Sequence, residues 1–266
     1  VLAYQVIKYI FSTLAKMANA YLIQSEPQGD KAASFAHARE IVLRESPEPG
    51  SLLVFPEMFA TGFLTRPEES LAEAIEPESP TVRFLQALAD ETDSLVLGGG
   101  IEKFLHGDFR FRNWTGIFEP GHSLPEKIYR KRHPFADEQK SFAPGTSAIL
   151  FKWKDFTVSP SICFDLRFPE DFRETRRQGA NLFCIQAEWP RERAMHFETL
   201  LRARSIENQC YTIAAARSGK NFANSCAFSP NGEEILKGSS EEGVFRISLQ
   251  AEEVAFARKN FPLPEF

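Results

Sequence analysis

The sequence lacks two features that would point to a membrane or a nucleic acid. Its uninterrupted hydrophobic runs are short, whereas a helix needs about 20 apolar residues to cross a bilayer, so a membrane-spanning protein is excluded. Its net charge is −5, and lysine and arginine are spread along the chain, so no basic stripe is available to follow a phosphate backbone. Neither a membrane nor a nucleic acid is therefore expected as a partner.

Cysteine is also scarce. The four cysteines include no C-x-x-C pair, and the five histidines show no metal-ligand spacing with them. This favours a reduced, cytoplasmic protein without a structural metal, and no cofactor is expected. Three of them, Cys184, Cys210 and Cys226, lie in apolar runs that predict strands, where a free cysteine usually acts as a small core residue.

The first sixteen residues differ from the rest of the chain. The segment "VLAYQVIKYIFSTLAK" has no initiator methionine, and we interpret Met17 as the natural start and residues 1–16 as a non-core extension. A signal peptide ending at "ANA" is the alternative. Because the same letters begin a predicted core strand, "ANAYLIQ", cleavage there would remove part of the fold.

Short apolar runs alternate with helix-like segments over residues 17–266, which predicts a single α/β domain. No linker, repeat or low-complexity tract interrupts the pattern. Strands are predicted at 20–24, 51–55, 94–103, 110–118, 148–153, 156–164, 180–187, 210–218, 224–236 and 243–249, with a hairpin turn at 229–233 inside 224–236. Helices are predicted at 31–46, 79–92, 169–179, 192–209 and 250–260, the second of them capped by Ser79.

Three reactive side chains follow predicted strands. Glu57 comes after "SLLVF", Lys131 closes the alternating stretch "EKIYR", and Cys163 ends "FTVSPSI". Each has a plain alternative: a solvated loop carboxylate, a solvated basic edge and a small core residue. Because strand ends of one sheet can present side chains to one pocket, the three together predict a catalytic site.

The segments "FPEMFATGF", "YRKRHPF" and "ICFDLRFPE", in this order, resemble the three signatures of the nitrilase, or carbon–nitrogen hydrolase, superfamily. Residues 187–219 are similar to the long-helix segment of its ω-amidase subgroup, and the resemblance spans residues 19–247. It implies a four-layer α-β-β-α sandwich that forms a homodimer through helix faces. It also implies that Glu57, Lys131 and Cys163 are the catalytic triad and that Glu138 is the second glutamate often found beside it.

These residue types suit the hydrolysis of an amide through a thioester. A free thiol is only slightly ionised at neutral pH, so Cys163 needs a base, and Glu57 can accept its proton. Lys131 and the backbone N–H of Phe164 would stabilise the oxyanion. No step requires a metal.

Substrate-binding residues are less defined. Arg167 either binds a substrate carboxylate or joins Asp165 and Glu170 in a local ion network. Glu188 stands where related sequences usually have asparagine, and its charge near the pocket wall would repel an acidic substrate. The loop after Arg217 departs from the related pattern, either by neutral drift or with an effect on specificity.

The sequence therefore predicts an amidase that acts on a small linear amide, with an ω-amidase for 2-oxoglutaramate as the preferred interpretation. The alternatives with the same chemistry are an N-carbamoyl amidohydrolase, a deaminated glutathione amidase and a nitrilase. A catalytically silent binding scaffold of the same fold is the alternative from another class.

Overall fold

Two mixed β-sheets pack face to face at the centre of the computed structural model, which describes residues 17–264. The first sheet has the spatial order β12 (Gly243–Leu249), β1 (Ala18–Gln24), β2 (Leu52–Val54), β3 (Leu95–His106), β4 (Phe109–Phe118) and β5 (Lys127–Arg130). The second has the order β11 (Glu234–Lys237), β10 (Cys226–Phe228), β9 (Tyr211–Ala216), β8 (Leu182–Ala187), β7 (Phe156–Ile162) and β6 (Phe151–Trp153). In each sheet three neighbouring strands are parallel, namely β1, β2 and β3 in one and β7, β8 and β9 in the other.

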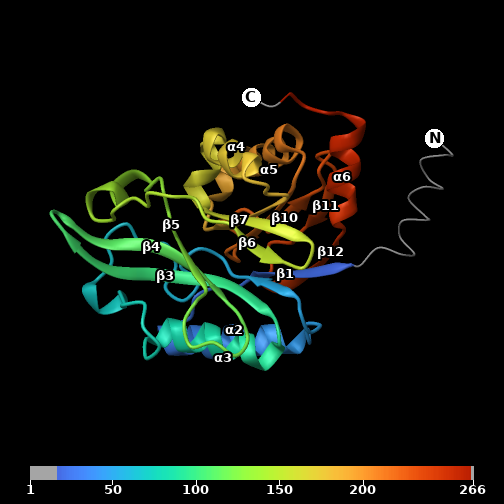
Figure 1. Cartoon of the computed structure of the whole chain (residues 1–266). Coiled ribbons are helices and arrows are strands. Elements are labelled where there is room, and N and C mark those ends of the chain that lie inside the picture. Colours follow the sequence, from blue (N-terminus) through green and yellow to red (C-terminus); the bar gives the residue numbers. More distant parts are fainter. Residues whose placement is uncertain (1–16, 265–266) are drawn as a thin grey trace.

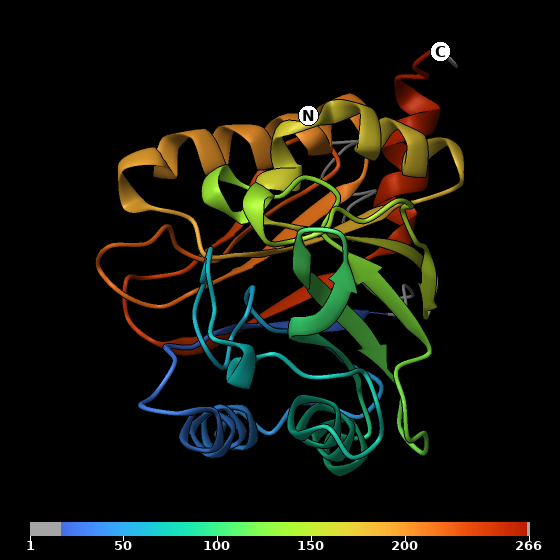
Figure 2. The same cartoon turned by 90° about the vertical axis from the view of Figure 1, so that its left-hand side faces the viewer.

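Helices cover the outer face of each sheet. Figures 1 and 2 show α2 (Lys31–Arg44) and α3 (Pro80–Thr92) side by side on the first sheet, and α4 (Pro169–Arg177) and α5 (Ala194–Asn208) on the second. A further helix, α6 (Ala251–Asn260), follows β12. The short 3-10 helices are η1 (Glu69–Leu71), η2 (Ala136–Lys140), η3 (Cys163–Arg167) and η4 (Arg191–Arg193). The predicted four-layer α-β-β-α sandwich is thus confirmed.

Three hydrophobic layers hold the sandwich together. Side chains such as Leu22, Val54 and Ile213 are fully buried between the two sheets. Separate clusters fill the space under α2 and α3 and the space under α4 and α5. The alternation of inward and outward side chains along each strand produces these layers, since one face of each sheet meets the other sheet and the opposite face meets helices.

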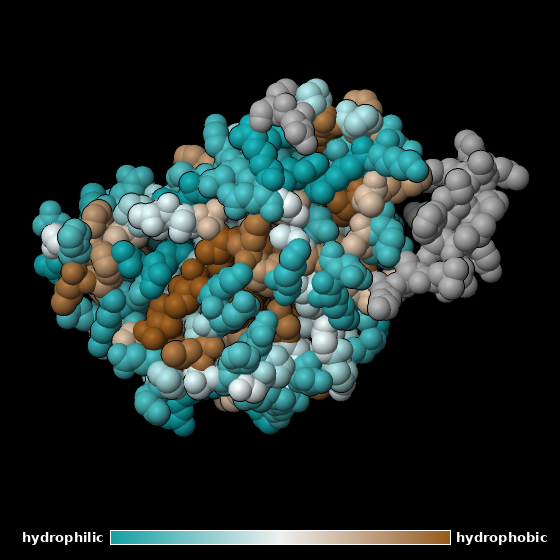
Figure 3. Space-filling model, viewed as in Figure 1, coloured by the Kyte–Doolittle hydropathy of each residue, from teal (hydrophilic) through white to brown (hydrophobic). Residues whose placement is uncertain are grey.

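Hydrophilic and hydrophobic side chains are unevenly distributed over the face shown in Figure 3. None of the helices within residues 17–264 is long and apolar enough to cross a membrane. The face shown in Figure 3 is largely hydrophilic, with hydrophobic side chains gathered in a strip near β3 and β5. The proposed extension at residues 1–16 lies outside the described residues.

The order of strands and helices agrees with the sequence prediction, but one local detail was wrong. The Ser79 side chain does not cap α3; its hydroxyl donates instead to the carbonyl of Ala74 at 2.6 Å. The carboxylate of Glu73 accepts from the N–H of Thr81 at 2.9 Å and takes over that role. The helix is thus capped by Glu73, which lies six residues before Ser79, and not by Ser79 itself.

The fold brings several strand ends to one place. β2, β3 and β5 run in the same direction within the first sheet, and so do β7, β8 and β9 in the second. The loops after β2, β5, β7 and β8 carry Glu57, Lys131, Cys163 and Glu188. This edge of the two sheets is therefore the candidate catalytic site.

Candidate active site

Lys131 lies between two buried glutamates. Its Nζ atom is 2.8 Å from Glu57 Oε1 and 2.8 Å from Glu138 Oε2. The side chains of Lys131 and Glu57 are 1% and 0% exposed, so neither is the solvated surface group that the alternative interpretation required. The amide of Asn113 donates to Glu57 Oε1 at 2.8 Å and to Glu138 Oε1 at 3.1 Å. These four side chains form a closed polar cluster.

Sharp turns at the strand ends aim these groups inward. Glu57 precedes Met58, whose φ of 46° reverses the chain directly after the carboxylate. Lys131 follows β5 and its N–H donates to the carbonyl of Asn113 at 2.9 Å, which extends the β4–β5 ladder by one residue. Gly145 donates to the carbonyl of Lys131 at 2.7 Å. A Cβ at this glycine would lie 2.1 Å from the carbonyl oxygen of Arg130, so only glycine permits this close approach.

Cys163 lies at the turn from β7 into η3. Its φ of 48° falls in the left-handed region, which a side chain rarely adopts unless its surroundings enforce it. The buried carboxylate of Asp165 enforces it, because it accepts from Ile162 N–H at 3.0 Å, His133 N–H at 2.9 Å and the Tyr129 hydroxyl at 2.8 Å. The Cys163 turn and the segment after Lys131 are thereby held by one side chain.

The electrostatics of this cluster keep the amine charged and the thiol neutral. Burial alone would lower the pKa of Lys131, but Glu57 and Glu138 outweigh it and raise that pKa. Burial, and then the negative charge of Glu57, raises the pKa of Cys163 well above its usual value, although Lys131 opposes both. Burial raises the pKa of Asp165 to about 6. The resting nucleophile candidate is therefore a thiol that needs a base.

A small cavity opens beside Cys163. Its volume is about 60 Å³, and its aromatic walls are Phe63, Phe135, Phe164 and Trp189. The polar groups that line it include Arg167, Glu188 and Arg193. The guanidinium carbon of Arg167 lies 4.9 Å from the ring centre of Trp189. The cavity suits a short molecule with an apolar middle and one charged end.

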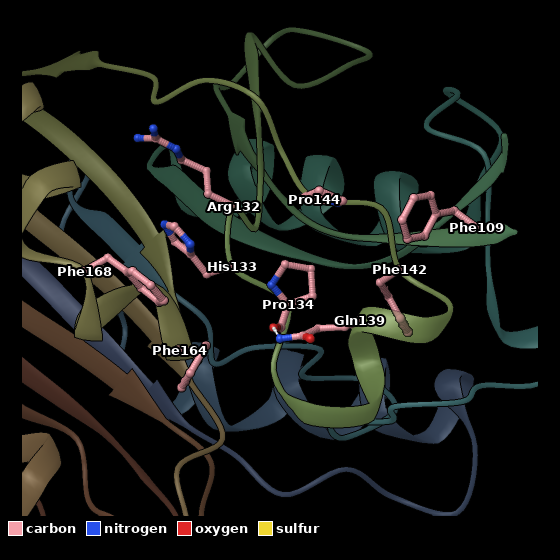
Figure 4. A pocket seen from close by; sticks show the side chains of 9 residues that line it. All are labelled: Phe109, Arg132, His133, Pro134, Gln139, Phe142, Pro144, Phe164 and Phe168. Atoms are coloured by element: carbon pink, nitrogen blue, oxygen red, sulfur yellow. Dashed lines mark hydrogen bonds between the residues drawn. The ribbon is translucent and has the colours of Figure 1, made fainter. Parts of the chain in front are cut away.

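A second cavity of about 290 Å³ adjoins the first, and Phe164 lines both (Figure 4). Its basic groups are already paired: Arg132 with Asp171 and Glu174, and His133 with Asp171. The imidazole of His133 also stacks on Phe168 at 3.5 Å between ring centres. None of the side chains of the Lys131 cluster lines this space.

The fold and this cluster define the class of protein. The chain belongs to the carbon–nitrogen hydrolase family, whose model matches residues 19–259. It is thus an enzyme that hydrolyses amides.

The chain is also similar to individual proteins of this family. The chain is 30% identical over 231 residues to the 2-oxoglutaramate amidase of Bacillus subtilis, with 84% of this chain and 87% of that protein covered. It is 29% identical to the omega-amidase YafV of Escherichia coli K12, with 79% and 82% covered. A carbon–nitrogen hydrolase superfamily protein from Xanthomonas campestris, solved with an arsenic adduct in its active site, has a TM-score of 0.80 and 28% identity, with 93% and 96% covered.

Most of the residues singled out in the sequence lie together. Glu57, Lys131 and Glu138 are in direct contact, and Cys163, Phe164, Arg167 and Glu188 line the adjoining cavity. The predicted ion network of Asp165, Arg167 and Glu170 was wrong. Asp165 accepts three neutral donors instead, and Arg167 faces Trp189 and His196.

Asn113 was missed by sequence reasoning. A buried asparagine inside a strand is unusual, since strand interiors disfavour it, and this was the available signal. Its two partners are supplied by other segments, so the pairing itself was not visible in the sequence.

Removing the Asn113 amide should loosen the cluster. In Asn113→Ala, both glutamates lose a donor, and we expect kcat to fall about 10- to 100-fold as Glu57 shifts. The free energy of unfolding should decrease by about 1–3 kcal/mol, because buried acceptors lose a partner. Steady-state kinetics and urea unfolding measure both. Asn260→Ala, at the exposed end of α6, is the control, and an unchanged kcat in Asn113→Ala would contradict the role.

Proposed function

We propose that this protein is an ω-amidase that hydrolyses the terminal amide of a small linear acid, of the 2-oxoglutaramate type, to a carboxylate and ammonia. The observation that carries the proposal is the Lys131 amine held by Glu57 and Glu138 beside the Cys163 thiol. The similarity to the 2-oxoglutaramate amidase of Bacillus subtilis supports the choice of substrate.

In the first half-reaction, Cys163 Sγ forms a bond to the amide carbon while its proton moves to Glu57. The electron pair of the carbonyl π bond moves to the oxygen, which becomes an oxyanion. When the carbonyl re-forms, the carbon–nitrogen bond breaks, the nitrogen takes the proton from Glu57, and ammonia leaves a thioester behind. The raised pKa of Cys163 supports general-base activation rather than a standing thiolate.

The oxyanion requires donors that are in place beforehand. Glu57 and Glu138 occupy two of the three N–H bonds of Lys131, and the third is left for the substrate oxygen. The backbone N–H of Phe164, in the first turn of η3, is the proposed second donor. Removing one such donor typically costs about 3 kcal/mol in the barrier.

Water completes the reaction. Glu57 takes a proton from the water as its oxygen attacks the thioester carbon. The carbon–sulfur bond then breaks, the sulfur takes back the proton, and the carboxylic acid is released. Glu138 orients Lys131 throughout and compensates its charge in a buried site.

Arg167 is proposed to bind the carboxylate of the substrate. It lines the cavity that contains Cys163, and ion pairs do not fix it among residues 17–264, since its nearest polar contact is His196 Nδ1 at 3.4 Å. A planar guanidinium can donate two hydrogen bonds to one carboxylate.

The change Arg167→Ala should therefore separate acidic from neutral substrates. We expect KM for 2-oxoglutaramate to rise about 10- to 100-fold, the usual effect of losing a hydrogen bond to a charged group, and KM for propionamide to stay unchanged. Ammonia release as a function of substrate concentration measures both. Arg177→Ala, at the exposed end of α4, is the control. Equal changes for the two amides would count against a carboxylate contact.

We also propose that the protein is a cytoplasmic homodimer that works without a cofactor. The free thiols of Cys163, Cys184, Cys210 and Cys226 support a reducing compartment. Exposed apolar residues on α5, namely Met195 and Ile206, support an interface on a helix face. Light scattering should give twice the monomer mass of 30.1 kDa; a mass near 30.1 kDa would exclude the dimer.

A substrate panel tests the function. Ammonia release should be fastest with 2-oxoglutaramate and 2-oxosuccinamate, slower with short aliphatic amides, and slowest with nitriles. Fastest turnover of a carbamoyl amino acid, of deaminated glutathione or of a nitrile would establish one of the alternative activities. Failure to hydrolyse any of them would favour the silent scaffold.

A further inference from the structure

We propose that Glu188 is a positioning residue, which acts through Arg217 to fix its own main chain, whose N–H contacts Glu57 and whose carbonyl faces Cys163. The proposal rests on the amidase function above and adds a residue that sets the geometry of the reacting groups. It assigns to Glu188 a role other than contact with the substrate.

The main chain of Glu188 lies against the two groups that exchange a proton. Its N–H donates to Glu57 Oε2 at 3.2 Å, and its carbonyl oxygen lies 3.9 Å from Cys163 Sγ. Two residues earlier in β8, the Gln186 amide donates to the carbonyl of Phe55 at 2.7 Å and ties β8 to the end of β2. A shift of the Glu188 main chain would therefore be passed on to both Glu57 and Cys163.

The side chain of Glu188 turns toward the protein and is anchored at both oxygens. Its Oε2 accepts from the N–H of Phe63 at 2.8 Å, and its Oε1 accepts from the Arg217 guanidinium at 2.9 Å. Phe63 belongs to the loop that carries Glu57, and Arg217 directly follows β9. One carboxylate thus joins the loops after β2, β8 and β9.

Close packing around this carboxylate supports a built contact. Gly62 has a φ of 71°, and a Cβ there would lie 3.0 Å from an Arg217 nitrogen and 3.4 Å from Glu188 Oε2. The N–H of Arg217 donates to the carbonyl of Ala187 at 3.0 Å, so the two partners are also joined through their backbones. The pair is therefore held by its surroundings, not only by its charges.

The ion pair between Glu188 and Arg217 also reduces the repulsion that the Glu188 charge was expected to exert on an acidic substrate. Burial raises the pKa of Glu188, but Arg217 opposes this and compensates the negative charge when it forms. Arg217 also pairs with Glu26, but this contact is longer, at 3.6 Å, and the Glu26 side chain is 55% exposed. The Glu188 charge is thus paired with Arg217, and Arg167 in the cavity stays available to a substrate carboxylate.

Kinetics of Glu188→Ala on two substrates test the proposal. A displaced Glu57 slows the chemical step for every amide, and a shift of about 1 Å can cost about 10²-fold, so kcat should fall about 10- to 100-fold for 2-oxoglutaramate and propionamide alike. KM for both should change less than about threefold, because no substrate contact is lost. A rise in KM for the acidic amide alone, or an unchanged kcat, would overturn the proposal.

Three further variants make the test specific. Because Arg217 transmits the effect, Arg217→Ala should lower kcat similarly, and the double variant should be no worse than the poorer single one. Additive losses would overturn the coupling. Glu26→Ala removes the outer partner of Arg217 and should keep kcat within about twofold, as expected for an exposed pair.

Glu188→Gln keeps the proposal testable if the alanine variant unfolds in thermal melts. A glutamine has one acceptor oxygen and can satisfy Phe63 or Arg217 but not both, so its kcat should lie between those of wild type and a full loss. A wild-type kcat in this variant would overturn the proposal. If the wild type itself releases no ammonia from either amide, the amidase function fails, and the role of Glu188 fails with it.

Discussion

Cys163→Ala should abolish ammonia release while leaving the fold intact. The thiol is the only proposed group that forms a bond to the substrate, so its loss removes the thioester route, and turnover should fall by at least about 10³-fold. Cys163 lies at the cavity and is only partly buried, so alanine leaves no large void in the core. The measurements are ammonia release and circular dichroism.

A matched control separates chemistry from packing. Cys226→Ala also removes one sulfur, but from the buried interior of β10, far along the chain from the Lys131 cluster. It should lower the melting temperature slightly and leave kcat unchanged. Substantial turnover in Cys163→Ala would eliminate the thioester mechanism.

Lys131→Met should remove activity and stability together. The substitution keeps a long side chain but leaves Glu57 and Glu138 buried without the ammonium that now lies 2.8 Å from each. Breaking a buried ion pair on one side typically costs about 3–5 kcal/mol. Turnover should fall by at least about 10³-fold, because the oxyanion also loses its charged donor.

The instability of Lys131→Met should depend on pH in a defined direction. Without the ammonium, the pKa of the buried Glu138 carboxyl, already raised by burial, should rise further above its value in the unfolded chain. Such a group favours the fold below its unfolded pKa, and this stability is lost as the pH rises through the folded pKa. Urea unfolding at several pH values should therefore show the largest difference from wild type at high pH.

Lys140→Met is the matched control, because this lysine is 65% exposed and pairs only with the surface carboxylate of Asp137 among the residues described. It should change the free energy of unfolding by less than about 1 kcal/mol at any pH. An equally small change in the free energy of unfolding for Lys131→Met would contradict the buried ion pairs of Lys131 with Glu57 and Glu138.

The sequence predicted the strands because their hydrophobic runs are continuous where both sheet faces are covered. It predicted the positions of Glu57, Lys131 and Cys163 because reactive groups stand out where such runs end. Their roles stay proposals. The contacts that could not be predicted are those made across the chain. Asn113 lies within β4, while its partners Glu57 and Glu138 lie after β2 and in η2, so only the fold brings them together. Glu188 meets Arg217 because β8 and β9 are neighbours.

Asp165 shows the same limit for charged residues. Its neighbours in the sequence include Arg167, so an ion network was the natural expectation. The fold instead places Tyr129 and the His133 peptide around the carboxylate, from a strand end of the other sheet. Two of the three donors to this carboxylate are thus set by the packing of the sheets, and only the Ile162 N–H is local in the sequence.

The raised pKa of Cys163 also bears on how readily its sulfur is oxidised by hydrogen peroxide. Hydrogen peroxide oxidises thiolates, and sulfur that stays protonated reacts slowly. Burial and the negative charge of Glu57 raise the pKa of Cys163, which favours the protonated, less reactive form of the sulfur. An arrangement that delays ionisation of the proposed nucleophile until an amide is bound would therefore also slow its oxidation by peroxide.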